Sequence, residues 1–174
     1  MCSVKLCLVP KNESAKKIKN PGNSYIGPHD QYISLLPDIP WIKDRDEAAK
    51  DFDGRKNTEA LIRAAHRGVR ITLVADYKNN LVDDKSGKPR AAFAALKSAG
   101  ADVRTIKAFA IHHDKVIIAN RKTVELGSFN YSSAAAQRNS ENVLVHWNNP
   151  ELASVYLKHF ERNYGLSEAF SAAY

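Results

Sequence analysis

The pattern of apolar and polar residues along the chain changes near Asn57. Before that point, prolines, glycines and scattered charges dominate, and no periodicity is sustained. Within this part only residues 2–9 have the character of a strand, and residues 44–52 have that of a short helix. We therefore divide the chain into a divergent, loosely ordered N-terminal segment, residues 1–56, and a regular domain, residues 57–174.

Helical and strand-like periods alternate within the regular domain. Apolar residues at helical spacing predict helices at 57–68, 90–100, 131–138 and 149–165. Runs rich in β-branched residues predict strands at 69–75, 101–106, 113–119, 123–128 and 142–147. A hairpin turn is expected at 120–122, and a polar loop at 76–89. This alternation predicts an α/β fold with helices layered on a mixed β-sheet.

The last predicted helix has the clearest start, because Asn149 is a suitable N-cap and Pro150 suits the first helical position. Its predicted apolar stripe consists of Leu152, Val155, Tyr156 and Phe160.

Composition narrows the classes of function. The chain has 174 residues, enough for one domain with a sizeable core, and its net charge of +7 favours polyanionic partners. Cys2 and Cys7 are close together and read as ordinary thiols. No apolar run is long enough to span a bilayer, and stable membrane insertion is not expected. No convincing signal peptide is visible, so a cytoplasmic location is the default expectation.

The stretch 111–142 concentrates polar residues of chemical interest between strand-like runs. In an extended strand His113 and Lys115 project from the same side, where an imidazole beside an ammonium suits a phosphate. Ser128 and Asn130 can hydrogen-bond non-bridging phosphate oxygens. Glu141 could orient a catalytic imidazole and raise its basicity.

These residues together resemble the signature of the phospholipase D superfamily, and their sequence is most similar to that of its small bacterial endonuclease branch. The residues that carry the resemblance are His113-x-Lys115, then Asn120, Gly127-Ser128-x-Asn130 and Glu141-Asn142. The resemblance extends from about Asn57 to Phe170. It implies an α/β/α sandwich, with helices on both faces of the sheet.

The resemblance also implies a metal-independent phosphodiesterase without a cofactor, acting through a covalent phosphohistidine. On this basis His113 attacks phosphorus, Lys115, Ser128 and Asn130 stabilise the phosphate oxygens, and Glu141 orients His113. A second histidine must protonate the leaving oxygen. Because the chain has one such motif, a homodimer is expected to supply it. DNA is the expected substrate, hydrolysed with little sequence preference.

Two departures from the family pattern leave alternatives open. Asn120 stands where the motif usually ends in aspartate, and the opening segment does not resemble the strand, helix and strand with which the family core begins. The secretory signal common in the small nucleases is not seen either. The alternatives are a catalytically impaired nucleic-acid-binding relative, a phospholipase D acting on phospholipid headgroups, and RNA as the substrate.

Other residues near the motif receive plainer interpretations. His112 should point to the strand face opposite His113, and three consecutive residues on a strand cannot all face one metal ion. Structural or surface roles are expected for His66, His146 and His159, and core packing for Phe129 and Trp147, although both aromatic rings could stack on bases. The cations that could contact a nucleic-acid backbone are Arg121, Lys122 and Arg138.

Overall fold

The protein is described by a computed structural model that covers residues 4–10, 24–27, 54–132, 134–135 and 138–171. Its strands are β1 (Val4–Pro10), β2 (Ser24–Gly27), β3 (Val69–Asp76), β4 (Asp102–Ile106), β5 (Lys115–Ala119), β6 (Thr123–Gly127), β7 (Val143–His146) and β8 (Ser167–Ala169). Its helices are α3 (Gly54–His66), the short π-helix η1 (Lys78–Asp83), α4 (Lys88–Ser98) and α6 (Pro150–Gly165).

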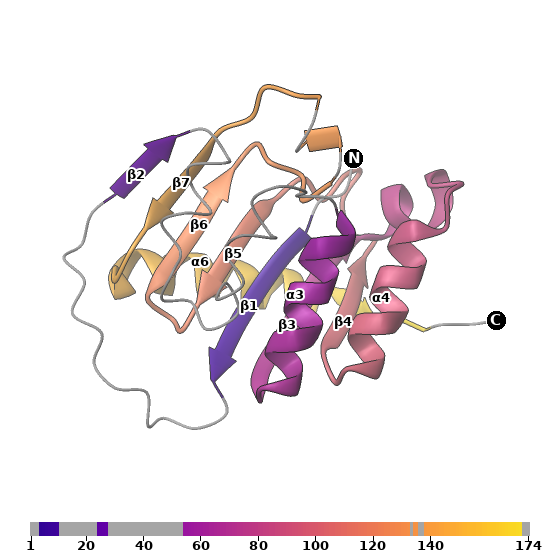
Figure 1. The fold of residues 1–174 in the computed structure, drawn as a ribbon, viewed down its shortest axis with the longest axis horizontal. Coiled ribbons are helices and arrows are strands. Elements are labelled where there is room, and N and C mark those ends of the chain that lie inside the picture. The colour runs from indigo at the N-terminus through magenta and orange to yellow at the C-terminus, as the bar shows by residue number, and fades with distance from the viewer. Residues whose placement is uncertain (1–3, 11–23, 28–53, 133, 136–137, 172–174) are drawn as a thin grey trace.

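All eight strands form one mixed sheet in the order β2-β7-β6-β5-β1-β3-β4-β8 (Figure 1). β1 occupies the middle, antiparallel to β3 and parallel to β5, with Val4 opposite both Ala75 and Lys115. β3 and β4 are parallel, and the remaining neighbours are antiparallel. Two strands of the segment 1–56 thus pair within the sheet, and the division of the chain after residue 56 stays a prediction.

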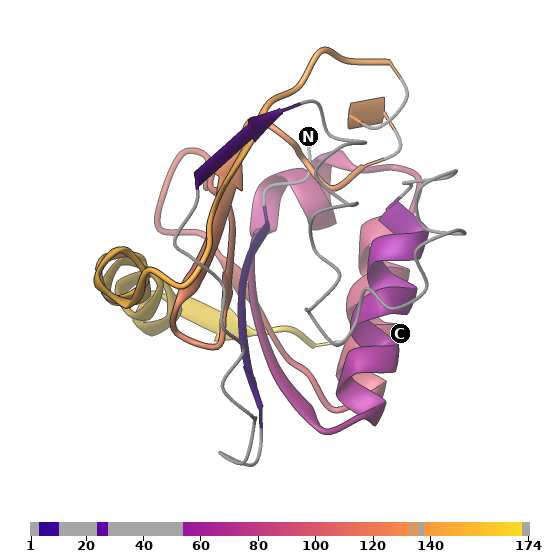
Figure 2. The same cartoon turned by 60° about the vertical axis from the view of Figure 1, so that its left-hand side comes forward.

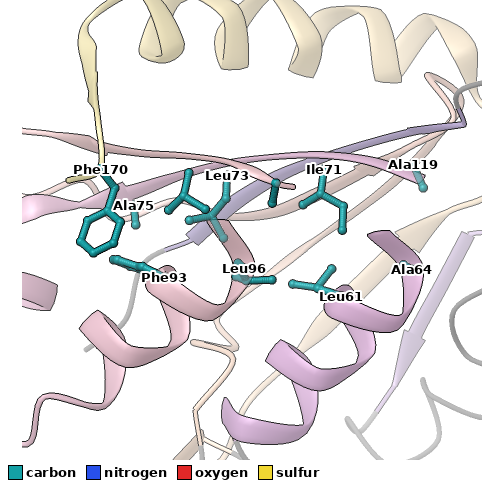
Figure 3. Close-up of a cluster of buried hydrophobic side chains, with 11 residues drawn as sticks. Leu61, Ala64, Ile71, Leu73, Ala75, Phe93, Leu96, Ala119 and Phe170 are labelled. Atoms are coloured by element: carbon teal, nitrogen blue, oxygen red, sulfur yellow. The ribbon is translucent and has the colours of Figure 1, made fainter. Parts of the chain in front are cut away.

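Helices cover both faces of the sheet, which confirms the predicted fold class. α3 and α4 lie side by side on one face, and α6 lies on the other (Figures 1 and 2). One buried cluster fills the space beneath α3 and α4, where Leu61, Phe93 and Leu96 meet Ile71 and Leu73 of β3 (Figure 3). A second cluster packs α6 against the other face. Its buried members are Val74, Ile106, Val116, Ile118, Val124, Ala153 and Phe160.

Most predicted elements of the regular domain are found within a few residues of their expected bounds. α3 begins at Gly54 rather than Asn57, and the expected polar loop at 76–89 contains the π-helix η1. The short strands β2 and β8 were not predicted. The predicted short helix at 44–52 lies outside the described residues, and that at 131–138 lies partly outside them.

α6 begins as predicted, because the Asn149 side chain accepts a hydrogen bond from the Leu152 backbone N–H at 2.9 Å. The prediction for its apolar stripe was wrong at Val155, which is 63% exposed. Ala153 is buried and Leu157 is partly buried in its place, because α6 turns the neighbouring positions toward β5 and β6. No helix in the described ranges has the length and apolar character needed to cross a bilayer.

The hairpin between β5 and β6 accounts for Asn120 in conformational terms. Asn120 and Arg121 have φ angles of 53° and 56°, in the left-handed region that a tight hairpin turn requires. The Lys122 N–H donates to the Ala119 carbonyl at 3.1 Å and closes the turn. Asparagine adopts this backbone conformation more readily than most residues. Asn120 is therefore suited to its place as a turn residue.

Candidate active site

The candidate catalytic residues gather at one edge of the sheet, which we call the site edge. β5 begins at Lys115, and its antiparallel neighbour β6 ends at Gly127. β7 begins at Val143, directly opposite Gly127. The segments just before β5, just after β6 and just before β7 therefore meet here. The end of β3 lies at the same edge, because β1 links Ala75 to Lys115 in register.

Lys115 supplies a nearly buried positive charge at this edge, with 6% of the residue exposed. Its Nζ donates a hydrogen bond to the His113 carbonyl oxygen at 2.8 Å. Burial lowers the pKa of the Lys115 ammonium from its ordinary value of 10.5, and the charges of Asp114 and Glu141 oppose that shift. An ammonium in this position is suited to a phosphate oxygen, which would compensate its lost hydration.

His113 lies just before β5, and its side chain is exposed. Within the described part of the chain its ring forms no hydrogen bond, and its backbone carbonyl accepts from Lys115. Neighbouring Asp114 reaches α6 on the far face of the sheet, an alternation that fits the predicted common side of His113 and Lys115. An exposed imidazole on a residue whose backbone binds a nearly buried ammonium can serve as a nucleophile or as an acid–base group.

Ser128 and Glu141 form a tight polar cluster between the end of β6 and the start of β7. The Ser128 hydroxyl donates to Glu141 Oε2 at 2.5 Å and accepts from the Asn142 N–H at 3.0 Å. The Ser128 N–H donates to the Asn142 carbonyl, also at 3.0 Å. Glu141 Oε1 accepts from the Asn139 side chain at 2.8 Å. The cluster fixes the Ser128 hydroxyl at the site edge.

The structure therefore brings Lys115, Ser128 and Glu141 together but does not form the predicted contact between Glu141 and His113. In the described residues the Glu141 carboxylate is hydrogen-bonded to Ser128 and Asn139 instead. Its charge still acts on Lys115. The predicted role of Glu141 in orienting His113 stays a prediction.

Asn130 follows the buried Phe129 and is partly buried. Its Oδ1 atom is enclosed without a hydrogen-bond partner among the described residues. Tyr131 next to it has a φ angle of 53°, edge-to-face contact with Phe129, and a hydroxyl that donates to the buried Glu125 at 2.9 Å. The turn that presents Asn130 is thus anchored by the contacts of Tyr131 with Glu125 and Phe129. Phe129 is buried, as expected for a core residue.

Gly127 permits the close approach of β6 and β7 beside Ser128. A Cβ atom at this position would lie 2.1 Å from the Asn142 carbonyl oxygen, a backbone atom that cannot move aside alone. The glycine of the motif is therefore required by packing, independently of any turn conformation.

Replacing Gly127 with alanine should lower the free energy of unfolding by about 1–3 kcal/mol, because the added methyl group forces β6 and β7 apart. Gly165→Ala is the matched control, since nothing lies within 4 Å of a Cβ there and alanine is the better helix former. Urea denaturation of both variants measures the difference. Equal stability of the two variants would contradict the packing role.

The cations near the motif lie at opposite ends of β5 and β6, so only some of them are close to the site edge. Arg138 is exposed in the segment between β6 and β7. Arg121 and Lys122 lie in the β5–β6 turn, at the end of β5 opposite Lys115, so they are remote from the site edge. His112 is 3% exposed, and its ring Nδ1 lies 3.9 Å from Asp114 Oδ2, the carboxylate oxygen that binds His159 of α6.

Sequence reasoning missed the polar residues that support the segment before β5. Asp76 at the end of β3 accepts from the His112 N–H at 2.8 Å, and Asp114 Oδ2 accepts from His159 Nε2 at 2.8 Å. The sequence assigns His159 only a structural or surface role. Strand alternation could have indicated that Asp114 faces a helix, but nothing in the sequence identifies its partner on α6. Among the described residues no group of three or more His, Cys, Asp or Glu side chains is arranged to hold a metal ion.

Comparison with known proteins agrees with this architecture. The family model described as cardiolipin synthase, PLD-like domain matches residues 48–164, which is more than half of the chain. In the crystal structure of Nuc, a phospholipase D family member from Salmonella typhimurium, the fold matches with a TM-score of 0.72 at 28% identity. That match covers 87% of this chain and 100% of the other. The chain belongs to the phospholipase D-like family.

Two curated relatives show how far the sequence match extends. The phospholipase D of Rickettsia felis is 41% identical over 103 residues, covering 59% of this chain and 48% of that protein. The mitochondrial cardiolipin hydrolase of Xenopus laevis is 29% identical over 111 residues, covering 64% of this chain and 50% of that protein. The chain thus spans about half the length of these relatives.

Proposed function

We propose that the protein hydrolyses phosphodiester bonds, that its substrate is DNA cleaved with little sequence preference, and that the reaction passes through a phosphohistidine on His113. The observation that carries the proposal is the nearly buried Lys115 ammonium bound to the backbone carbonyl of His113, whose side chain is exposed, with the Ser128 hydroxyl fixed at the same edge. Membership of the phospholipase D-like family supports the reaction class.

The proposed reaction has two displacements at phosphorus. A ring nitrogen of His113 attacks in line, a P–N bond forms, and the P–O bond to the leaving group breaks. Lys115 and Asn130 stabilise the negative charge on the remaining oxygens, and Ser128 joins them once its hydroxyl proton turns from Glu141 to the phosphate. A water molecule then attacks phosphorus, the P–N bond breaks, and the imidazole is restored.

The leaving oxygen needs a proton, and the water must lose one. We assign this role to the partner subunit's His113 in a homodimer whose two-fold axis passes by the site edge, because an isologous interface brings two copies of one residue together. The exposed position of His113 supports this assignment, since a second copy can approach it.

DNA as the substrate is supported by the net charge of +7 and by the exposed Arg138 in the segment between β6 and β7. Cations around a phosphodiester site raise the local concentration of a polyanion without reading its sequence.

A phospholipid substrate is the second candidate, and one observation favours it. Phe109 and Ile111, just before His112 and His113, are 40% and 45% exposed. Apolar side chains beside a phosphodiester site suit contact with acyl chains. A relative from Rickettsia felis carries the name phospholipase D, and that name supports a phospholipid substrate.

The test is incubation of supercoiled plasmid with the purified protein in EDTA, beside His113→Ala and beside vesicles of anionic phospholipid. We expect nicked plasmid with the wild type, none with the variant, and little headgroup release. Headgroup release without nicking would favour the lipid substrate. Retention of DNA without nicking by both proteins would indicate a binding protein, and loss of nicking in EDTA would refute the metal-independent mechanism.

A further inference from the structure

We propose that Asp114 and His159 form a positioning pair, which holds residues 112–114 against helix α6 and thereby aims His113 and Lys115 at the substrate. This inference rests on the proposed function, because it assigns a role within the same site. It concerns the face of the sheet opposite to the one that the reaction uses.

Asp114 lies between the two candidate catalytic residues in sequence, but its side chain reaches α6. Its Oδ2 atom accepts a hydrogen bond from His159 Nε2 at 2.8 Å and a longer one from Asn163 Nδ2 at 3.3 Å. His159 and Asn163 stand one helical turn apart on α6, which runs behind β5 and β6 (Figure 1). One carboxylate oxygen therefore fastens the residue between His113 and Lys115 to the helix.

The residue on the other side of His113 is anchored as well. The His112 N–H donates to Oδ2 of the buried Asp76 at 2.8 Å, and the His112 ring Nδ1 lies 3.9 Å from Asp114 Oδ2. The Phe109 ring stacks on His112 with centroids 6.5 Å apart. The guanidinium of Arg162, also on α6, lies 5.9 Å from the Phe109 ring centroid. The segment that carries His113 is thus fixed from β3 and from α6.

His113 depends on this framework because its ring has no hydrogen-bond partner among the described residues and is exposed. Its place is therefore set by the backbone of residues 112–114. That backbone also supplies the carbonyl oxygen that receives Lys115 Nζ. A rotation of these peptide groups would displace both catalytic side chains together. A displacement of about 1 Å at a reacting group can cost about 100-fold in rate.

The pair is poorly placed to act mainly on global stability. The side chains of His159 and Asp114 are 36% and 32% exposed, and polar contacts with such access to solvent contribute little to folding. A positioning role and a merely structural role therefore predict different results. The first lowers turnover with little loss of stability, and the second lowers stability first.

The experiment compares His159→Ala, His159→Gln and the control Glu161→Ala, an exposed position on the same helix. With bis(p-nitrophenyl) phosphate as the substrate, we expect His159→Ala to lower kcat by about 10- to 100-fold, with KM changed by less than about twofold. The glutamine amide can still donate to Asp114, so His159→Gln should recover much of the loss. Amide hydrogen exchange of residues 109–116 should become faster in His159→Ala only.

An unchanged kcat, unchanged exchange, or an equal loss in Glu161→Ala would each overturn the positioning role. Failure of the proposed function would look different, because wild-type and His113→Ala proteins would then hydrolyse the diester equally or not at all. In that case faster exchange in His159→Ala would still establish the anchor, while its catalytic role would be overturned together with the proposed function.

Discussion

Replacement of His113 with alanine should reduce hydrolysis of a phosphodiester by on the order of 10⁴-fold or more, because the variant lacks both the proposed nucleophile and the proposed proton donor. The fold should be retained, since the His113 side chain is exposed and its ring forms no hydrogen bond within the described part of the chain. The measurement is the rate of p-nitrophenol release, with thermal unfolding of both proteins as the check on folding.

Mixtures of wild-type and His113→Ala chains test the shared site. If one site is built from both copies, activity should fall with the square of the wild-type fraction, because only dimers of two wild-type chains hold both imidazoles. Independent sites in single chains would give a linear decline. A linear decline, or full activity from a species of monomer mass, would rule out the homodimeric site.

Replacement of Lys115 with methionine should lower kcat by about 10²- to 10³-fold, because the transition-state charge on the phosphate oxygens loses its ammonium. Stability should not fall in parallel, since the nearly buried charge is replaced by an apolar side chain of similar length. Kinetics and urea denaturation of the same preparation separate the two effects. A loss of stability that matches the loss of activity would indicate that Lys115 is structural.

The lowered pKa of Lys115 should also appear in the pH dependence. Because burial disfavours the ammonium, the free enzyme should lose this charge below the ordinary value of 10.5, and kcat/KM should fall there as the pH rises. A bound phosphate favours the ammonium, so the corresponding fall in kcat should come at higher pH. In Lys115→Arg the charge persists to far higher pH, and this alkaline fall should disappear. If it remains at the same pH in Lys115→Arg, another group is responsible.

The lowered pKa of Lys115 affects stability in the opposite direction to activity, because kcat/KM falls as the pH rises whereas the free energy of unfolding increases. Between the folded pKa of Lys115 and 10.5 the unfolded chain binds more protons than the folded chain. The contribution of Lys115 to the free energy of unfolding therefore rises with pH in this window.

The strands around the motif could be predicted because each carries its own pattern. β5 carries Val116, Ile117 and Ile118 in succession and β6 opens with Thr123 and Val124, all β-branched, and a short polar turn joins the two strands. β2 and β8 have four and three residues, too few for an alternating pattern, and they exist because β7 and β4 offer unpaired backbone groups. Val155 shows the same limit on a helix, since its exposure depends on where the sheet meets α6.

The site could be predicted as a set of residues but not as a set of contacts. Lys115, Ser128 and Glu141 do meet at one edge, as strand pairing requires. The partners of the Glu141 carboxylate depend on how residues 139–142 lie against Ser128, a tertiary arrangement that gives the carboxylate Ser128 and Asn139. Likewise, only the packing of α6 against the sheet brings His159 to Asp114.

The central position of β1 has a consequence for how the chain folds. β1 comes first in the sequence, yet its partners are β3 and β5, far along the chain. The strands on either side of it are joined to their own neighbours by shorter connections, so β3 with β4, and β5 with β6, can assemble before β1 is inserted. Closing such long loops costs entropy before any pairing rewards it, which makes late steps of this kind slow. Until β1 docks, two open strand edges face each other, and premature association of chains is the competing outcome.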